Sequence, residues 1–270
     1  MSFVFLIATL LTLCPLVSLL IYILSQGLAR FDLSALTQLP PPPNGTGGGF
    51  ANALVGSLVM AGIASSLSIP IGVFGAVYVV EFGQGWAKLV SLGANILYSV
   101  PSILVGVFVY GLIVIPTTII SQGRYSFSAI AGGVALGIVM LPVVFQTTLE
   151  SLKQIETEIR WGGLAVGATT SQVVLGIVLP GASPSIGTGI LLGIGRIAGE
   201  TAPLIFTALF NQYWARSLLD RTASLGVLIY EFSRSPFKNQ QQLAWTTALI
   251  LCMLIAGGTV IAKVFSGGRK

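Results

Sequence analysis

The sequence predicts an all-α integral membrane protein with about six transmembrane helices. Only 8% of the 270 residues are charged and the mean hydropathy is +0.93, whereas soluble domains carry roughly 25% charged residues. Apolar stretches of roughly 20 residues, the length that crosses a bilayer, recur between segments rich in charge, proline or glycine. Lipid must therefore be the solvent for much of the surface.

Residues 3–24 form the first predicted span, which is uncharged throughout. A cleaved signal peptide would begin with basic residues, but no Lys or Arg precedes Arg30, so we expect a retained helix. Residues 26–50 contain four consecutive prolines and three consecutive glycines. Because these residues interrupt helices, the segment is predicted to be an exposed loop.

Three further spans are predicted, at residues 52–80, 90–115 and 127–146. A short polar hairpin, residues 81–88, separates the first two of them. Pro101 removes a helical hydrogen bond within the third span of the chain and predicts a kink or a break there. Gly133 and Gly137 have the spacing that allows helices to approach closely in lipid. Glycines that the membrane helix merely tolerates are an equally good interpretation.

Residues 147–172 are charged and are expected in water or at the membrane interface, where three acids form a solvated face: Glu150, Glu156 and Glu158. A fifth span is predicted at residues 186–210, a polar loop at 211–242 and a sixth span at 243–264. Six spans place both termini on one side of the membrane. Lys and Arg divide six against six between the two sides, so the positive-inside rule does not fix the orientation. The basic pair Arg269–Lys270 favours cytoplasmic termini weakly.

The composition excludes several classes of function. The chain has no histidine, which removes histidine-based acid–base catalysis, histidine metal ligands and Ser-His-Asp triads. It has no G-x-x-x-x-G-K-[ST] phosphate-binding loop and no clustered basic stripe for nucleic acid. Cys14 and Cys252 lie within apolar runs and are interpreted as small hydrophobic residues. We therefore expect no catalytic site, no metal and no cofactor.

Arg196 and Glu200 lie inside the fifth predicted span, which is otherwise uncharged. An ionisable residue at the bilayer centre costs about 3 kcal/mol on insertion scales and marks a substrate or ion pathway. The four-residue spacing places both side chains on one helix face, where a guanidinium can bind an oxyanion in bidentate fashion and the carboxylate prevents the anion from being trapped. Pro203 predicts a distorted helix nearby. The alternative is an internal salt bridge that neutralises itself and holds neighbouring helices together.

Residues 159–180 form a partly amphipathic segment that Gly167 interrupts. On physical grounds the segment is either an interfacial helix or a docking element for another protein. It resembles the signature loop of bacterial ABC-importer permeases, in which E-A-A, three residues, Gly, nine residues and I-x-L-P follow one another. Gly167 is followed by nine residues and then by Ile-Val-Leu-Pro at 177–180.

In that family the loop forms a short coupling helix that seats in a cleft of the ATPase subunit. Trp161 and the two following glycines stand where the family has E-A-A, so a contact made through the acid does not carry over. The resemblance implies a role in ATPase coupling for five residues: Arg160, Gly167, Ala168, Leu179 and Pro180.

Residues 193–208 read Gly-Ile-Gly-Arg-Ile-Ala-Gly-Glu-Thr-Ala-Pro-Leu-Ile-Phe-Thr-Ala. Together with Gly-Gly-Phe at 48–50, Val-Pro-Ser-Ile at 100–103 and Leu-Pro at 141–142, this run resembles the PstA family of phosphate-importer permeases from about residue 48 onward. The partner family PstC usually has Met-Ala-Val after Gly-Glu-Thr. The resemblance implies a substrate path through five residues: Arg196, Glu200, Thr201, Pro203 and Gln146. The last of these stands where the family typically has Arg.

The resemblance implies a MetI-like importer fold for residues 48–270, with a coupling segment at about 155–180, preceded by a first transmembrane helix and outside loop at 1–47. The expected function is that of a permease in the bacterial cytoplasmic (inner) membrane that imports inorganic phosphate. The expected partners are a homologous PstC-like permease, two PstB-like ATPase subunits and an extracytoplasmic PstS-like phosphate-binding protein. The alternatives are a permease for sulfate, molybdate or phosphonate and, more distantly, an ATPase-independent channel or membrane scaffold.

Overall fold

The computed structural model describes the backbone of residues 2–267 and, within that range, the side chains of residues 5–7 and 9–260. The described part consists of helices and loops. Arg269 and Lys270 lie outside it. Six helical segments are long and apolar enough to cross a membrane, which confirms the predicted number: Phe5–Leu28, Ala51–Phe82, Ser102–Ile120, Ala129–Lys153, Thr170–Ala198 and Lys238–Val260.

The described helices include three short π-helical turns, labelled η. In chain order the elements are α1 (Ser2–Leu28), α2 (Leu33–Thr37), α3 (Ala51–Val77), η1 (Tyr78–Phe82), α4 (Ala87–Ser99), α5 (Ser102–Val109), η2 (Tyr110–Val114), α6 (Ile115–Ile120), α7 (Ala129–Lys153), α8 (Thr157–Ala165), α9 (Thr170–Val173), η3 (Val174–Val178), α10 (Leu179–Ala198), α11 (Ala202–Thr207), α12 (Leu225–Ser233) and α13 (Lys238–Gly267).

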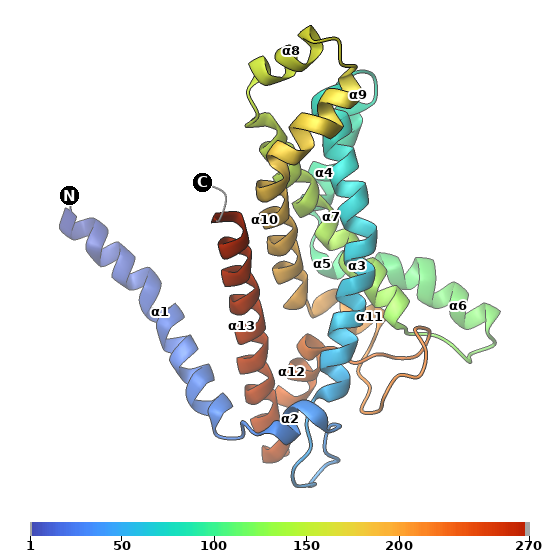
Figure 1. The fold of residues 1–270 in the computed structure, drawn as a ribbon. Coiled ribbons are helices and arrows are strands. Elements are labelled where there is room, and N and C mark those ends of the chain that lie inside the picture. The colour runs from blue at the N-terminus through green and yellow to red at the C-terminus, as the bar shows by residue number, and fades with distance from the viewer. Residues whose placement is uncertain (1, 268–270) are drawn as a thin grey trace.

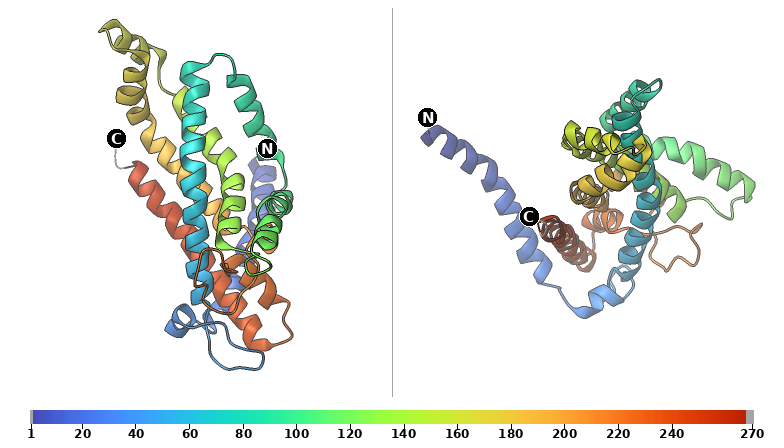
Figure 2. Two further views of the ribbon diagram at one scale, coloured as in Figure 1. Left: turned by 90° about the vertical axis from the view of Figure 1, so that its right-hand side faces the viewer. Right: turned by 45° about the horizontal axis from the view of Figure 1, so that its top comes forward.

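The bundle is built around α7, which packs against both α3 and α10 (Figure 1). Helix α8 projects from the upper end in that view, and α12 closes the lower end beside α2. Helix α1 stands apart from the bundle, with α13 as its main packing partner (Figures 1 and 2). The N-terminal end of α1 and the C-terminal end of α13 both point toward the end that carries α8, as an even number of crossings requires.

Small residues allow α3 and α7 to pack closely. A Cβ atom added to Gly133 would lie 2.5 Å from the Cβ atom of Ile63, and one added to Gly137 would lie 3.4 Å from the backbone oxygen of Ala64. Both glycines are buried at this interface. The Gly133/Gly137 spacing therefore serves helix packing, which was one of the two interpretations that the sequence left open.

The predicted limits of the third and fifth spans were wrong. The chain breaks at Val100 and Pro101 into α4 and α5, so the crossing begins only at Ser102. The fifth crossing is Thr170–Ala198 rather than 186–210. Residues 173–179 of its first half are apolar, and Val173, Val174 and Val178 are buried against the bundle. The helix continues through Pro180 and Pro184, although proline favours a helix end on sequence grounds.

The predicted polar segments at 81–88 and 211–242 were also partly wrong. Glu81 belongs to η1, which shortens the first hairpin. In the second, α12 buries Leu225, Leu228 and Phe232 in a small core at the lower end of the bundle. Ser224 begins this helix by accepting a hydrogen bond from the backbone N–H of Val227.

We predict that Gly133→Ala lowers the thermal stability of the protein in detergent, because the added methyl group would displace Ile63 from α7. Overpacking of this kind costs about 1–3 kcal/mol. Gly62→Ala is the matched control, since nothing lies within 4 Å of a Cβ atom at that position in α3. Equal unfolding temperatures for the two variants would contradict the close packing.

Candidate functional site

Helix α8 presents apolar side chains to the surroundings at one end of the molecule. Trp161 is 65% exposed, Val166 is 85% exposed and Leu164 is also exposed. Such a cluster at the tip of a projecting helix has the character of a protein-docking surface. We call Trp161, Leu164 and Val166 the α8 tip.

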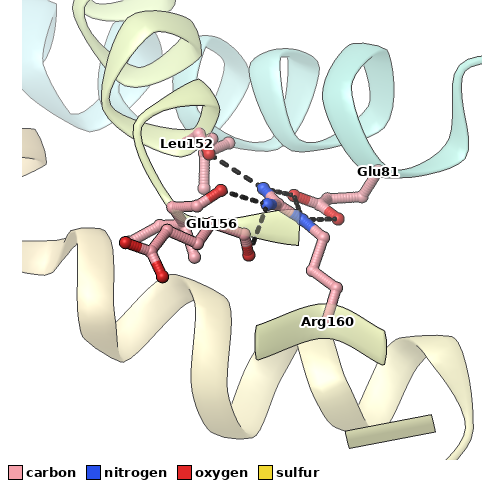
Figure 3. A network of polar contacts seen from close by, with 5 residues as sticks. Glu81, Leu152, Glu156 and Arg160 are labelled. Carbon is pink, nitrogen blue, oxygen red and sulfur yellow. Dashed lines mark hydrogen bonds and ion pairs between the residues drawn. The ribbon is translucent and has the colours of Figure 1, made fainter. Parts of the chain in front are cut away.

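Arg160 attaches α8 to the transmembrane helices (Figure 3). Its Nη2 atom lies 2.8 Å from Oε1 of Glu81, and its Nε atom lies 3.1 Å from Oε2 of the same carboxylate. Nη2 also donates to the carbonyl oxygen of Leu152, at 2.8 Å, and Nη1 donates to the carbonyl oxygen of Ile155. One guanidinium therefore links α8 to η1 and to the end of α7.

The exposed fraction of the Glu81 side chain is only 5%, and that of Arg160 is 18%. A buried carboxylate without its partner would be strongly destabilising. The sequence assigned Arg160 to ATPase coupling, and the structure shows it bound to its own chain. Glu81 was missed because it lies 79 residues away in sequence, and no local pattern connects the two.

Gly167 ends α8 with a left-handed backbone. Its φ angle is +88° and nothing lies within 4 Å of a Cβ atom placed there, so conformation rather than space favours glycine. Gly167 donates to the carbonyl oxygen of Leu164, and Ala168 donates to that of Gly163. The chain reverses at this point, and Thr169 begins α9 with a capping box formed with Gln172.

Leu179 and Pro180 lie at the start of α10, directly after η3. Leu179 packs against the core that also contains Val178, while Pro180 is exposed. Because proline lacks a backbone N–H, the wider π-helical turn before it lets the helix continue without the missing bond. The predicted coupling segment thus contains one exposed tip and a rigid connection to α10.

Arg196 lies in the last turn of α10, and Glu200 lies just beyond the helix end. The prediction that both share one helix was wrong, because α10 ends at Ala198. Their side chains still approach, with Nε of Arg196 4.0 Å from Oε1 of Glu200. This is a loose ion pair, and the Arg196 side chain remains 39% exposed.

The Arg196–Glu200 pair lies between a cavity and an aromatic side chain. Glu200 lines a mostly apolar cavity of about 230 Å³ whose wall includes Leu58 and Ala61 of α3. Arg196 contacts an aromatic ring: its guanidinium carbon lies 5.6 Å from the centre of the Tyr98 ring. A cation–π contact of this kind partly compensates for the loss of water around the cation.

Thr201 and Pro203 form the break between α10 and α11, which confirms the distortion predicted from Pro203. Thr201 precedes α11 and Pro203 is buried in its first turn. A Cβ atom on Gly106 would lie 2.6 Å from the Cα atom of Pro203, so α5 and α11 are in close backbone contact. Among the described residues, no contact joins Thr201 or Pro203 to Gln146.

Gln146 lies on α7 and donates a hydrogen bond from Nε2 to Oδ1 of Asn95 on α4. It shares a hollow with Tyr98, the residue that Arg196 contacts. Asn95 and Tyr98 therefore join Gln146 to Arg196, although sequence reasoning singled out neither. The available signal was their three-residue spacing, which places two polar side chains on one face of a helix.

Comparison with known proteins assigns the chain to a family. Residues 68–266 match the family described as "Binding-protein-dependent transport system inner membrane component". The chain is 38% identical to the phosphate transport system permease protein PstA of Yersinia pestis over 248 residues, which cover 91% of this chain and 82% of that protein. It is 33% identical to the probable phosphate transport system permease protein PstA of Methanocaldococcus jannaschii, covering 91% and 85%.

Solved structures of ABC importers share the fold. The MetNI methionine ABC transporter in an inward-facing conformation matches 80% of this chain and 93% of its own, with a TM-score of 0.57 at 19% identity. A bacterial ABC transporter involved in import of the acidic polysaccharide alginate matches 82% and 80%, with a TM-score of 0.59 at 16% identity. These similarities support the MetI-like architecture alone.

The fold and the sequence relatives define the chain as a multi-pass membrane permease, a transport subunit and not an enzyme. It belongs to the family of binding-protein-dependent transport system inner membrane components, and within that family it groups with the PstA permeases. The expected family and fold are thereby confirmed.

We predict that Glu81→Ala loosens α8. Removal of one partner of a buried ion pair costs about 3 kcal/mol. A tenfold change in the exchange rate corresponds to about 1.4 kcal/mol. The backbone amides of Thr157–Ala165 should therefore exchange hydrogen at least about tenfold faster than in the wild type. Hydrogen exchange followed by mass spectrometry measures this.

Glu150→Gln is the control, because Glu150 pairs with Lys153 at an exposed position and such pairs contribute little. If α8 exchanged at the wild-type rate in Glu81→Ala, the attachment through Arg160 would be disproved.

Proposed function

We propose that the chain is the transmembrane permease subunit of an ATP-driven phosphate importer and forms the path for inorganic phosphate with a homologous permease. The observation that carries this proposal is Arg196, whose partly exposed guanidinium lies beside a helix break in the bundle. The names of the PstA relatives support phosphate as the substrate.

The geometry around Arg196 suits transient binding of an oxyanion. A guanidinium presents several N–H donors in a fork that matches two oxygens of phosphate. The 4.0 Å separation from Glu200 leaves room for an anion to compete with the carboxylate for the same donors. Glu200 balances the charge when the path is empty, so Arg196 does not hold the ion permanently.

The substrate path in this proposal includes Arg196, Glu200 and Gln146, while Thr201 and Pro203 shape the break that exposes them. Gln146 offers an amide N–H in place of the positive charge that relatives typically have. Arg196 is then the principal cationic group on this stretch of the path.

The α8 tip supports coupling to an ATPase. Its exposed apolar side chains would seat in a cleft of one of two ATPase subunits, and Arg160 would transmit the movement of α8 to η1 and α7. Gly167 and Ala168 hold the reversal that orients the tip, and Leu179 and Pro180 continue the connection into α10. An extracytoplasmic phosphate-binding protein would deliver the substrate at the opposite end of the bundle.

We further propose that the protein resides in the bacterial cytoplasmic (inner) membrane with the α8 end inside. Residues 1–47 would form a peripheral first helix and outside loop, and residues 48–270 the transport domain with a coupling segment at about 155–180. The packing of α1 on α13 rather than on the central helices supports this division.

Uptake of labelled phosphate under phosphate limitation, with and without this chain and with sulfate as competitor, tests the proposal. Loss of high-affinity uptake that sulfate does not affect supports a phosphate permease. Unchanged phosphate uptake together with loss of sulfate, molybdate or phosphonate uptake would replace phosphate with that oxyanion.

Arg196→Gln should abolish phosphate uptake at unchanged membrane abundance, because the bidentate cation is lost. Arg196→Lys should retain part of the uptake, since it keeps the charge but not the fork. Immunoblots of membranes control for abundance. A fall in abundance that parallels the fall in uptake would instead favour a purely structural ion pair with Glu200.

Gly167→Asp should uncouple ATP hydrolysis from transport, because a carboxylate would stand beside the apolar α8 tip. Gly167→Asn is matched to it in shape, and both residues tolerate a left-handed backbone, so Asn should preserve most of the coupling. The ratio of ATP hydrolysed to phosphate transported in proteoliposomes reports the difference. Similar ratios for both variants would argue against docking through this surface.

A further inference from the structure

One face of α4 carries polar side chains for which neither the fold nor the ATPase connection accounts. Lys88, Ser91, Asn95 and Tyr98 are spaced three, four and three residues apart and therefore lie along one side of the helix. We call these four residues the α4 stripe. Figure 2 shows α4 descending beside α3 from the turn that joins them.

The α4 stripe lines two hollows in the surface. Lys88, Ser91 and Asn95 contribute to the first, which has a volume of about 480 Å³. Asn95 and Tyr98 contribute to the second, of about 460 Å³, whose opposite wall is formed on α7 by Gln146. Both hollows are shallow and open, and Asn95 lines both, so they adjoin along α4; together we call them the groove.

One end of the groove is lined by Tyr98, over whose ring the guanidinium of Arg196 lies. The other end is lined by Lys88, next to the turn between η1 and α4. That turn lies at the end of the bundle that carries α8, because Glu81 of η1 is bonded to Arg160. The groove therefore leads from the neighbourhood of Arg196 to the side on which ATP would be hydrolysed.

The chemistry of the groove suits an anion. Oδ1 of Asn95 accepts the hydrogen bond from Gln146, which leaves the Asn95 amide N–H groups as donors. Ser91 and Tyr98 add hydroxyl groups, and Lys88 adds one positive charge. The hydroxyl of Thr147 also lines the second hollow, but it donates to the carbonyl oxygen of Val143. Among the described residues that line the two hollows, none is a carboxylate.

Lipid is not a suitable neighbour for this face. Polar side chains in hydrocarbon lack partners and are costly, so within membrane proteins they face the bundle interior or a water-filled cavity. Asn95 and Tyr98 are exposed in this chain. A water-filled path, separated from lipid by a second subunit, would provide hydrogen-bond partners for both side chains.

We infer that the α4 stripe is the exit route of phosphate from Arg196 to the α8 side of the membrane. This inference rests on the proposed function. Neutral donors bind a divalent anion more weakly than a guanidinium does, and conduction requires sites that the ion can leave. Tyr98, Asn95 and Ser91 thus provide neutral, weak sites after the strong one, and the positive charge of Lys88 attracts the anion toward the α8 end.

Thiol accessibility tests the route without relying on transport. Cys14 and Cys252, both free, are first replaced by alanine in the complete transporter. Ser91→Cys and Asn95→Cys are then treated in inverted membrane vesicles with a charged, membrane-impermeant thiosulfonate. Ile96→Cys is the control, because Ile96 is 55% exposed on α4 but lines neither hollow.

Thiols at positions 91 and 95 should react at least about tenfold faster than the thiol at 96. Apolar surroundings raise the pKa of the thiol at 96, and each pKa unit lowers the fraction of reactive thiolate about tenfold. Added phosphate should slow the reactions at 91 and 95 alone. Equal rates at 95 and 96, or no protection by phosphate, would overturn the route.

Transport by Asn95 variants provides a second readout. Asn95→Asp should reduce phosphate uptake more than Asn95→Leu, since a carboxylate repels the anion while leucine only removes donors. Equal, unimpaired uptake by both variants at wild-type abundance would also overturn the route. If the wild-type transporter carried another oxyanion and that ion protected positions 91 and 95, the substrate assignment would fail while the route would stand.

Discussion

The ion pair between Arg160 and Glu81 is the constraint on which the arrangement of the α8 end depends. Helix α8 is short and largely exposed, and few apolar contacts hold it to the bundle. A single guanidinium with several partners replaces those contacts and joins α8 both to the nearby end of α7 and to η1, which is 79 residues away in sequence. Because the carboxylate is buried, the pair cannot open without a large free-energy cost. Movement of α8 must therefore move η1 and the end of α7 with it.

Close packing of α7 with its neighbours supplies the rigid body to which this movement is transmitted. Gly137 brings α3 into backbone contact with α7, Gly133 accommodates the side chain of Ile63, and Gly189 of α10 accommodates the side chain of Thr147. Interfaces of this kind deform little and tend to shift as units. The helix break packs against α12, where a Cβ atom on Gly226 would lie 2.6 Å from Oγ1 of Thr201 and 3.1 Å from the carbonyl oxygen of Glu200. The side chains of Arg196 and Glu200 form a loose ion pair of 4.0 Å, whose separation can change when the units shift.

Hydropathy was sufficient to predict six crossings, and a local motif was sufficient to predict the break near Pro203. The fifth crossing was misplaced because the helix continues through Pro180 and Pro184, residues that on sequence grounds favour a helix end. Helix α12 was missed because its apolar run is too short to resemble a span. The link from Arg160 to Glu81 joins residues 79 positions apart, and only the folded chain brings them together. Asn95 and Tyr98 could have been found from their spacing on an otherwise apolar helix.

The attachment of α1 has a consequence for biosynthesis. This helix packs on α13, where the ring of Tyr22 meets that of Trp245 and Thr246 donates to the carbonyl oxygen of Gly27. Helix α1 is thus synthesised before its main packing partner. It must reside in lipid without that partner while the helices between α1 and α13 are inserted, and the apolar composition of Phe5–Leu28, with a mean hydropathy of 2.4, suits it to do so. The contacts between α1 and α13 consequently form late in assembly, after the central helices have been inserted.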